Sequence, residues 1–334
     1  MFTKLYAEIK KIIRENWKMI CLFLLLSGIA LFPLPYYIDT PGGAIDISKK
    51  IKMEEKQDAK GSLNFAYVTE LKATTVTYFL SFFNKEWEVL KKSDVTYDNE
   101  TIKDMEFRDK LLLEESNDNA ILVAYQKLGK KVSIESEHTF ITYIDEEANT
   151  DLMVGDEVLT LNGEKIKNKD DFLSKIRKHN IGDTIHLTVK DGNKERKATL
   201  IDNNGVPMIG VSVNTDTDLE TDPKISIQKE ENESGPSGGL MLSLAIYNSL
   251  TKEDITHGKK IVGTGTIDRE GNVGSIGGVS FKLKGAVKEK ADIFLVPAGD
   301  NYEDAIQLKK KNKYDIEIKA IKTFEEALTY LKSL

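Results

Sequence analysis

The sequence is poor in cysteine, in histidine and in clustered basic residues, and each scarcity excludes a class of protein. The single cysteine, Cys21, has no partner in the chain, so no internal disulfide can form and the fold must depend on packed cores. The four histidines follow no metal-binding spacing, and we expect neither a metal nor a cofactor. The net charge of -7 and the lack of a basic run interleaved with aromatics argue against nucleic acid.

Charge is also missing from one continuous stretch, Met19 to Ile38, whose 20 residues would cross a bilayer core of about 30 Å as a helix. Basic residues gather before this stretch, and the positive-inside rule then places the N-terminus in the cytoplasm; they are Lys4, Lys10, Lys11, Arg14 and Lys18. The sequence therefore predicts a single-pass anchor. A cleaved signal peptide ending near Gly28-Ile29-Ala30 is the alternative.

The strongest chemical signal is the segment Glu233-Ser234-Gly235-Pro236-Ser237-Gly238-Gly239. The residues after it, up to Leu250, are apolar nearly all round, which is typical of a buried helix. Ser237 would then lie at a helix N-terminus, where unpaired N–H groups and the helix dipole stabilise an oxyanion. The glycines on either side keep the approach to the hydroxyl clear. This pattern is typical of a serine nucleophile.

A serine nucleophile needs a base, and Lys282, 45 positions later, is the candidate. On a helix, Gly285 and Ala286 lie three and four positions beyond it, and these small residues let its stem pack against protein. Burial would lower the pKa of the amine from about 10.4 toward the working pH. Ser237 and Lys282 together predict a catalytic dyad.

Three segments in order resemble the proteolytic domain of Lon-type (S16) proteases, a family with a serine/lysine dyad. The serine motif corresponds to Gly235-Pro236-Ser237-Gly238-Gly239, a middle segment to residues 263–278, and a closing strand to Asp292-Ile293-Phe294-Leu295-Val296-Pro297. The resemblance implies that Ser237 and Lys282 are catalytic. It further implies that Thr264 supports the lysine and that Gly235, Pro236 and Gly238 support the serine.

The chain departs from the Lon pattern in three respects. Ser234 stands where an acidic residue usually precedes Gly-Pro-Ser, with Glu233 one position further back, and Gly238 replaces the usual alanine. No phosphate-binding loop of the form GxxxxGK[ST] occurs in the 334 residues. We therefore expect no ATP-driven unfolding, and a substrate that is already extended.

A second resemblance covers about 70 residues before the protease-like part. Residues 152–163 contain Gly155-Asp156 and Asn162-Gly163 at the spacing seen in PDZ domains of bacterial proteases, followed by a helix around 170–177 and paired strands about Asp191-Gly192. PDZ domains bind extended peptides by strand addition. The carboxylate-binding loop would lie near Ser133 to Thr139. The alternative to peptide binding is that this domain is a rigid spacer.

Together these features resemble the SepM/YlbL-like membrane proteases of Gram-positive bacteria. They imply an α+β protein that is a membrane-anchored, ATP-independent serine endopeptidase, which processes extracytoplasmic peptides, signalling peptides among them, or exported proteins. The predicted parts are a cytoplasmic tail (1–18), a transmembrane helix (19–38), a β-rich extracytoplasmic region (39–129), a PDZ domain (130–204) and a Lon-like protease domain (205–334). Within the β-rich region, alternation predicts strands over 63–69 and 74–83, followed by a helix from about Ser116 to Leu128. A membrane-tethered PDZ adaptor with a catalytically silent Lon-like domain, or an esterase or acyltransferase with the same dyad, stays open.

Overall fold

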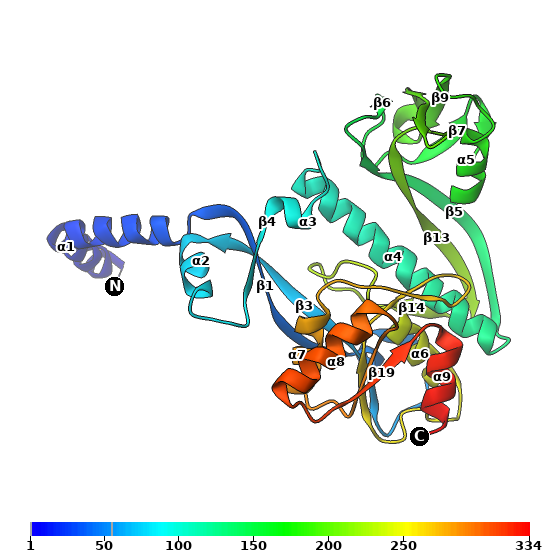
Figure 1. The fold of residues 1–334 in the computed structure, drawn as a ribbon. Coiled ribbons are helices and arrows are strands. Elements are labelled where there is room, and N and C mark those ends of the chain that lie inside the picture. The colour runs from blue at the N-terminus through cyan, green and yellow to red at the C-terminus, as the bar shows by residue number, and fades with distance from the viewer. Residues whose placement is uncertain (1, 55) are drawn as a thin grey trace. The chain divides into compact units, whose positions relative to one another are not determined.

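A computed structural model describes residues 2–54 and 56–334, so Met1 of the predicted tail and Glu55 lie outside it. The chain divides into two compact units (Figure 1). Of the described residues, the first unit contains 2–41 and 69–95, and the second contains 42–54, 56–68 and 96–334. The strands β1 (Pro33–Asp46) and β3 (Ser62–Thr74) each contribute residues to both units.

The first unit begins with helix α1 (Phe2–Ala30) and continues into the first part of β1. Here β1 pairs antiparallel with β4 (Glu88–Lys91), which is followed by α3 (Lys92–Val95). Between them lies α2 (Thr75–Ser81), where alternation in the sequence had suggested a strand over 74–83. Thr74 and Thr77 form a capping box at its start, and this local hydrogen bonding favours a helix.

The predicted transmembrane helix over residues 19–38 is wrong. Helix α1 ends at Ala30, and the remaining residues from Pro33 onward lie in strand β1, because Pro33 and Pro35 lack the N–H groups that would continue a helix. The helical part of the stretch, residues 19–30, measures about 18 Å against a bilayer core of about 30 Å.

Within residues 2–54 and 56–334, no helix combines the length and the apolar character needed to cross a membrane. This finding overturns the prediction of a single-pass protein of the cell membrane with a cytoplasmic N-terminus and an extracytoplasmic catalytic domain. The α+β character of the chain is confirmed, and the transmembrane helix is removed from the predicted fold class.

The second unit is built on a largely parallel sheet with strand order β19-β18-β15-β3-β1. Strands β15 (Lys260–Gly263), β18 (Ile293–Pro297) and β19 (Glu317–Ile321) run parallel to one another and to β3. Side chains alternate between the two faces, so that Ile261 and Val262 belong to different cores. Burial on both faces explains why β18 is wholly apolar, whereas the edge strand β19 carries Glu317 and Lys319.

Helices cover both faces of this sheet. One core contains residues of α4 (Ile102–Lys127), α6 (Gly239–Leu250) and α9 (Phe324–Lys332); the other contains residues of α7 (Val279–Lys288) and α8 (Asp300–Asn312). The first core also includes Ile47, Ile51 and Leu63. Residues from far apart in the chain therefore build one protease-like core.

Short elements complete this region. An extra 3-10 turn, η1 (Ile47–Lys49), precedes β2 (Ile51–Met53), which pairs antiparallel with β14 (Ile225–Ile227). A second small hairpin joins β16 (Thr266–Ile267) to β17 (Val273–Gly274).

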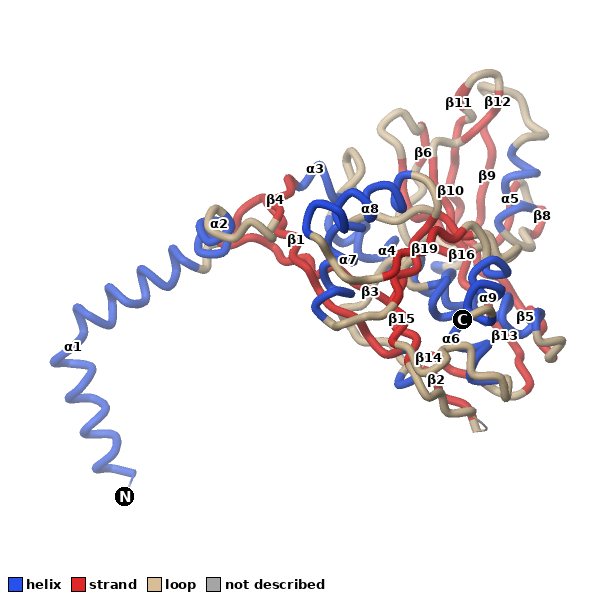
Figure 2. Tube along the Cα trace, turned by 60° about the horizontal axis from the view of Figure 1, so that its bottom comes forward, coloured by secondary structure: helices blue, strands red, loops and turns tan. Residues whose placement is uncertain are grey.

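A separate core lies in residues 141–213 and matches the predicted PDZ pattern. Its sheet has the order β6-β10-β9-β7-β8, and Figure 2 shows β6, β9 and β10 gathered together. The predicted helix is α5 (Lys169–Ile176), which buries Phe172 and Ile176 in this core. The other elements are β6 (Asn149–Thr150), β7 (Val158–Leu161), β8 (Glu164–Lys165), β9 (Thr184–Val189), η2 (Asp191–Asn193), β10 (Lys194–Thr199), β11 (Ile201–Asn203) and β12 (Val206–Met208).

A long antiparallel ribbon joins the two cores of the second unit. It consists of β5 (Lys131–Ile144) and β13 (Val211–Asp222), paired from Ile144 and Val211 at one end to Lys131 and Asp222 at the other. Val213 packs in the PDZ-like core, whereas Leu219 packs against the protease-like core. Helix α4 lies against both strands (Figure 1).

Candidate active site

Ser237 lies two residues before helix α6, at the carboxyl end of strand β15. Gly238 is the N-cap of this helix, and residues Gly239 to Ser249 are all buried, as the apolar sequence predicted. The Ser237 side chain itself is only partly buried. The end of a parallel strand and the start of a buried helix therefore place an accessible hydroxyl beside the positive end of a helix dipole.

The backbone of Ser237 is fixed by the residues that follow β15. Its carbonyl accepts hydrogen bonds from the N–H of Gly265 at 2.8 Å and from Thr264 Oγ1 at 3.1 Å. Thr264 is fully buried and its own N–H donates to the carbonyl of Leu295 on β18. Thr264 thus contacts the serine backbone, where the Lon resemblance implied support of the lysine.

Helix α4 holds the other side of the serine loop. The N–H of Gly235 donates to the carbonyl of Asp109 at 2.8 Å, and Ser116 Oγ donates to the carbonyl of Pro236 at 2.9 Å. Gly235 has a φ of +83°, a left-handed conformation that glycine adopts without strain. The loop is therefore tied to packed structure on both sides of Ser237.

Lys282 approaches Ser237 from helix α7, on the opposite face of the sheet from α6. Its Nζ donates to Ser237 Oγ at 3.0 Å, so the structure brings together the two residues predicted to form the dyad. The Lys282 residue is 5% exposed, and burial lowers the pKa of its amine to about 8. A substantial neutral fraction is then present at mildly alkaline pH.

Two glycines place α7 close enough for this contact. Gly278 caps the helix with a φ of +67°, where a Cβ would approach Val68 Cγ2 to 2.8 Å. Gly285 lies one turn beyond Lys282, and a Cβ there would meet the backbone of Gly43 at 3.2 to 3.3 Å. These glycines therefore allow α7 to pack closely on β1 and β3, as the small residues beside Lys282 had suggested.

The two departures that lie in the Lon serine motif each have a structural counterpart. Glu233 forms an ion pair with the buried amine of Lys50, which also donates to the carbonyl of Gln228 at 3.5 Å. The carboxylate is thereby engaged in holding the loop. A Cβ added to Gly238 would lie 3.7 Å from Phe65, an ordinary contact, so the alanine usual in Lon proteins would fit.

Two backbone donors at the serine remain unpaired. The N–H groups of Ser237 and Gly238 donate to no acceptor among the residues that the structure describes. Buried backbone donors are nearly always paired, whereas donors left free beside a nucleophile can bind a developing oxyanion.

The segment predicted to be the carboxylate-binding loop of the PDZ domain, Ser133 to Thr139, is not a loop. It lies inside β5 and pairs with β13. Within the described chain, β13 pairs with β5 alone, and α5 packs beside it. A strand that pairs with a single other strand, next to a helix, is the arrangement to which an extended peptide can add as a further strand.

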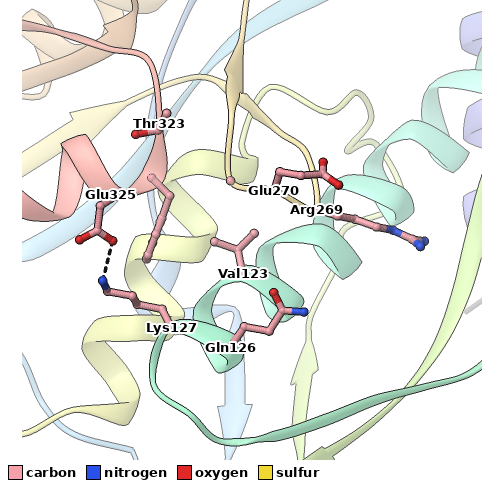
Figure 3. Close-up of a pocket in the computed structure, with 9 residues that line it drawn as sticks. Val123, Gln126, Lys127, Arg269, Glu270, Thr323 and Glu325 are labelled. Carbon is pink, nitrogen blue, oxygen red and sulfur yellow. Dashed lines mark ion pairs between the residues drawn. The ribbon is translucent and has the colours of Figure 1, made fainter.

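A hollow of about 210 Å³ lies elsewhere in the protease-like core, between the end of α4, the turn at 269–271 and the start of α9 (Figure 3). Lys127 and Glu325 form an ion pair of 2.6 Å at its wall. Neither Ser237 nor Lys282 lines it. We assign it no part in the chemistry.

Sequence reasoning missed the part that α4 plays at this site. It had predicted a helix starting near Ser116, whereas α4 starts at Ile102 with Thr101 as its N-cap. Ser116 is thus in the helix interior and 4% exposed. The available signal was a run of polar residues, Ser116-Asn117-Asp118-Asn119, directly before an apolar segment, and such a run also resembles a helix cap.

Comparison with known families and proteins agrees with a PDZ-like core followed by a protease-like core. Residues 120–201 match the model of the PDZ domain, and residues 215–332 match that of the Lon protease (S16) C-terminal proteolytic domain. The Lon protease of Campylobacter jejuni is 28% identical over 120 residues, which are 33% of this chain and 15% of that protein. The Lon protease of Campylobacter concisus is 33% identical over 94 residues, or 28% of this chain and 11% of that protein.

These curated relatives are thus matched over 15% or less of their own length. Among solved structures, the PDZ domain of an SdrC-like protein from Listeria monocytogenes is 24% identical, covering 25% of this chain and 92% of that one with a TM-score of 0.21. Its counterpart from Listeria innocua is 28% identical, covering 23% and 92% with a TM-score of 0.21. The chain carries a PDZ domain and, after it, a proteolytic domain of the Lon (S16) type, which is a serine peptidase domain.

Proposed function

We propose that this protein is an ATP-independent serine endopeptidase in which Ser237 is the nucleophile and Lys282 is the general base. The observation that carries the proposal is the 3.0 Å hydrogen bond between Lys282 Nζ and Ser237 Oγ, made by an amine whose burial lowers its pKa to about 8. A lysine that only balanced surface charge would be exposed and would keep its ordinary pKa.

In the first half of the reaction, neutral Lys282 takes the proton from Ser237 Oγ as that oxygen forms a bond to the scissile carbonyl carbon. The carbonyl oxygen becomes an oxyanion, which the N–H groups of Ser237 and Gly238 stabilise. The C–N bond then breaks, and the Lys282 ammonium returns the proton to the leaving amine. The product is an acyl-enzyme ester on Ser237.

In the second half, water replaces the amine. Lys282 takes a proton from the water as its oxygen attacks the ester carbon, and the Ser237 oxygen leaves and regains that proton. Gly235, Pro236 and Thr264 have no part in proton transfer in this scheme. They hold the loop so that Ser237 Oγ and the two N–H groups keep their orientation.

The PDZ domain supports a substrate that is an extended peptide or a disordered segment of a protein. Such a chain could add to the part of β13 beside α5, where β13 has no second strand partner, and this would supply binding energy remote from the scissile bond. The proposal of ATP independence rests on the sequence, since its 334 residues contain no phosphate-binding loop. The order of PDZ and Lon-type domains supports kinship with the SepM/YlbL-like peptidases.

The experiment that tests this function is digestion of an unstructured protein and of short fluorogenic peptides without nucleotide, with the wild type beside Ser237→Ala. We expect cleavage by the wild type, loss of measurable turnover in the variant, and the same thermal midpoint for both. Equal turnover would rule out Ser237 as nucleophile. A wild type that binds the unstructured protein without cleaving it would favour the adaptor with a silent Lon-like domain.

A further inference from the structure

The serine loop is also held by a residue that lies outside its own sequence motif. Ser116 Oγ, buried in the middle of α4, donates at 2.9 Å to the carbonyl of Pro236, the residue directly before the proposed nucleophile. The same carbonyl accepts a longer hydrogen bond, 3.3 Å, from the N–H of Gly239. The hydroxyl of Ser116 is therefore the closer of the two groups that set the direction of this carbonyl.

The direction of the Pro236 carbonyl decides the direction of the next N–H. A peptide group is planar, and in the trans form its C=O and N–H point in opposite directions. Asp222-Pro223 is the one cis bond found among the described residues, so the bond between Pro236 and Ser237 is trans. Fixing the carbonyl of Pro236 thus fixes the N–H of Ser237, one of the two unpaired donors at the site.

The neighbouring peptide group follows the same logic. The carbonyl of Ser237 accepts from Gly265 and Thr264, which fixes the N–H of Gly238, the second unpaired donor. The two donors are therefore oriented from two different elements. The segment after β15 orients the N–H of Gly238, and helix α4 orients that of Ser237.

We propose that Ser116 is a positioning residue of the active site, which orients the Ser237 N–H toward the oxyanion through its hydrogen bond to the Pro236 carbonyl. This inference rests on the proposed function of Ser237. Ser116 suits the role because α4 packs against α6 and the β5–β13 ribbon, so the hydroxyl is carried by a rigid element. The Asp109 carbonyl, which accepts from Gly235, holds the same loop two residues earlier.

The test compares Ser116→Ala with Ser243→Ala in the full chain. Ser243 is a matched control, because it is a fully buried helical serine whose Oγ donates to a carbonyl, that of Leu240, at 2.7 Å within α6. Cleavage of a short fluorogenic peptide gives kcat and KM, and the thermal midpoint reports folding. A peptide boronate, which forms a tetrahedral adduct on serine, measures oxyanion binding separately from substrate binding.

We expect Ser116→Ala to lower kcat about tenfold or more and to weaken boronate inhibition by a similar factor, with KM changed less than twofold. The pH at which activity reaches half its maximum should not move, because Lys282 is untouched. Ser116→Cys, which keeps a weak donor, should fall between the wild type and Ser116→Ala. Ser243→Ala should keep the wild-type kcat.

Equal kcat in wild type and Ser116→Ala would overturn the positioning role, as would equal losses in Ser116→Ala and Ser243→Ala. If Ser116→Ala does not fold, Ser116→Cys decides the question, and a kcat within twofold of wild type then contradicts the inference. A failure of the positioning role can be told apart from a failure of the proposed function, because in the first case Ser237→Ala would still be inactive. An active Ser237→Ala would instead remove the dyad itself.

Discussion

Lys282 shows at the scale of a single residue how catalysis and stability oppose each other. Its amine is buried in a protein core, and its pKa falls because burial disfavours the ammonium form. No ion pair of Lys282 exists in the part of the chain that the structure describes. The same desolvation that makes Lys282 a base at moderate pH therefore destabilises the folded protein when the amine is protonated.

Activity should rise with pH through a value near 8, since Lys282 accepts the serine proton only when neutral. Lys282→Arg should be as inactive as Lys282→Ala, because a guanidinium stays protonated at any workable pH. Lys284→Ala is the control: its amine lies over the ring of Phe281 and does not reach the serine. Rates of peptide cleavage between pH 6 and 10 check this; substantial turnover by Lys282→Arg would show that the base is another group.

Lys282→Met should abolish activity and raise stability at pH 7 by on the order of 1–3 kcal/mol, because a buried ammonium is replaced by an apolar side chain of similar length. The folded-state pKa of about 8 lies below the unfolded value, so the unfolded chain binds more protons between the two. The penalty is thus complete below pH 8 and disappears as pH approaches about 10.4. Denaturant unfolding at pH 7 and pH 10 should show the advantage of Met only at the lower pH.

At the scale of an element, packing at the start of α6 explains why two adjacent glycines differ in how well they tolerate substitution by alanine. A Cβ at Gly238 meets only Phe65, at 3.7 Å, whereas a Cβ at Gly239 would lie 2.5 Å from Ser116 Oγ and 2.7 Å from Ile267 Cγ2. One position has room for a methyl group. The other is where α6 touches α4 and the β16–β17 hairpin.

Gly238→Ala should therefore keep peptidase activity within a few fold of wild type, while Gly239→Ala should lose most activity and about 1–3 kcal/mol of stability through overpacking. The two variants make the same chemical change at neighbouring positions, so each serves as the control for the other. Peptide turnover and thermal midpoints measure the difference. Similar values for both would mean that α6 can shift away from α4 at little cost.

Elements also show where sequence reasoning succeeds. The buried helix α6 and the helix carrying Lys282 could be predicted, because apolar periodicity and the spacing of small residues are local properties. Ser116, Asp118 and Asn119 lie where the sequence predicted the start of a helix, at about Ser116, and polar residues of this kind favour caps. Their partners are the carbonyl of Pro236, the N–H of Thr217 and the carbonyl of Ile267, and no local pattern reveals contacts so distant in sequence.

The apolar stretch at residues 19–38 was misread for a related reason. Hydropathy alone does not distinguish a helix from a helix followed by a strand. Pro33 and Pro35 would fit the outer end of a span, yet the strand they begin pairs with β4, whose residues lie 49 to 55 positions along the chain from their partners. That pairing is a tertiary property.

At the scale of the second unit, the PDZ core is an insertion at the tip of the β5–β13 ribbon. The N–H of Asp145 donates to the carbonyl of Gly210 at 2.8 Å, so the two ends of the insertion already lie at hairpin distance. Residues 146–209 can therefore be replaced by a short turn without stretching either strand. Ile141 and Val213, which the change would expose, would be replaced by threonine.

We expect this shortened protein to cleave a short peptide at a rate close to that of wild type and to cleave a long unstructured substrate much more slowly. The reason is that the PDZ domain supplies remote binding and the chemistry lies elsewhere. Parallel assays of both substrates with both proteins check the prediction. Equal losses on the two substrates would indicate that the PDZ domain is a rigid support for the protease.

Strand β13 has one more consequence, for how the second unit comes apart. Its Val213 end belongs to one core and its Leu219 end to the other, with no linker between them. Two domains joined by a flexible tether would melt separately, whereas here both cores pack on one continuous ribbon, so that melting either core frays the strands on which the other core packs. Calorimetry should therefore record one heat-absorption peak for both cores, and amide hydrogens along β13 should exchange with deuterium at similarly slow rates from end to end.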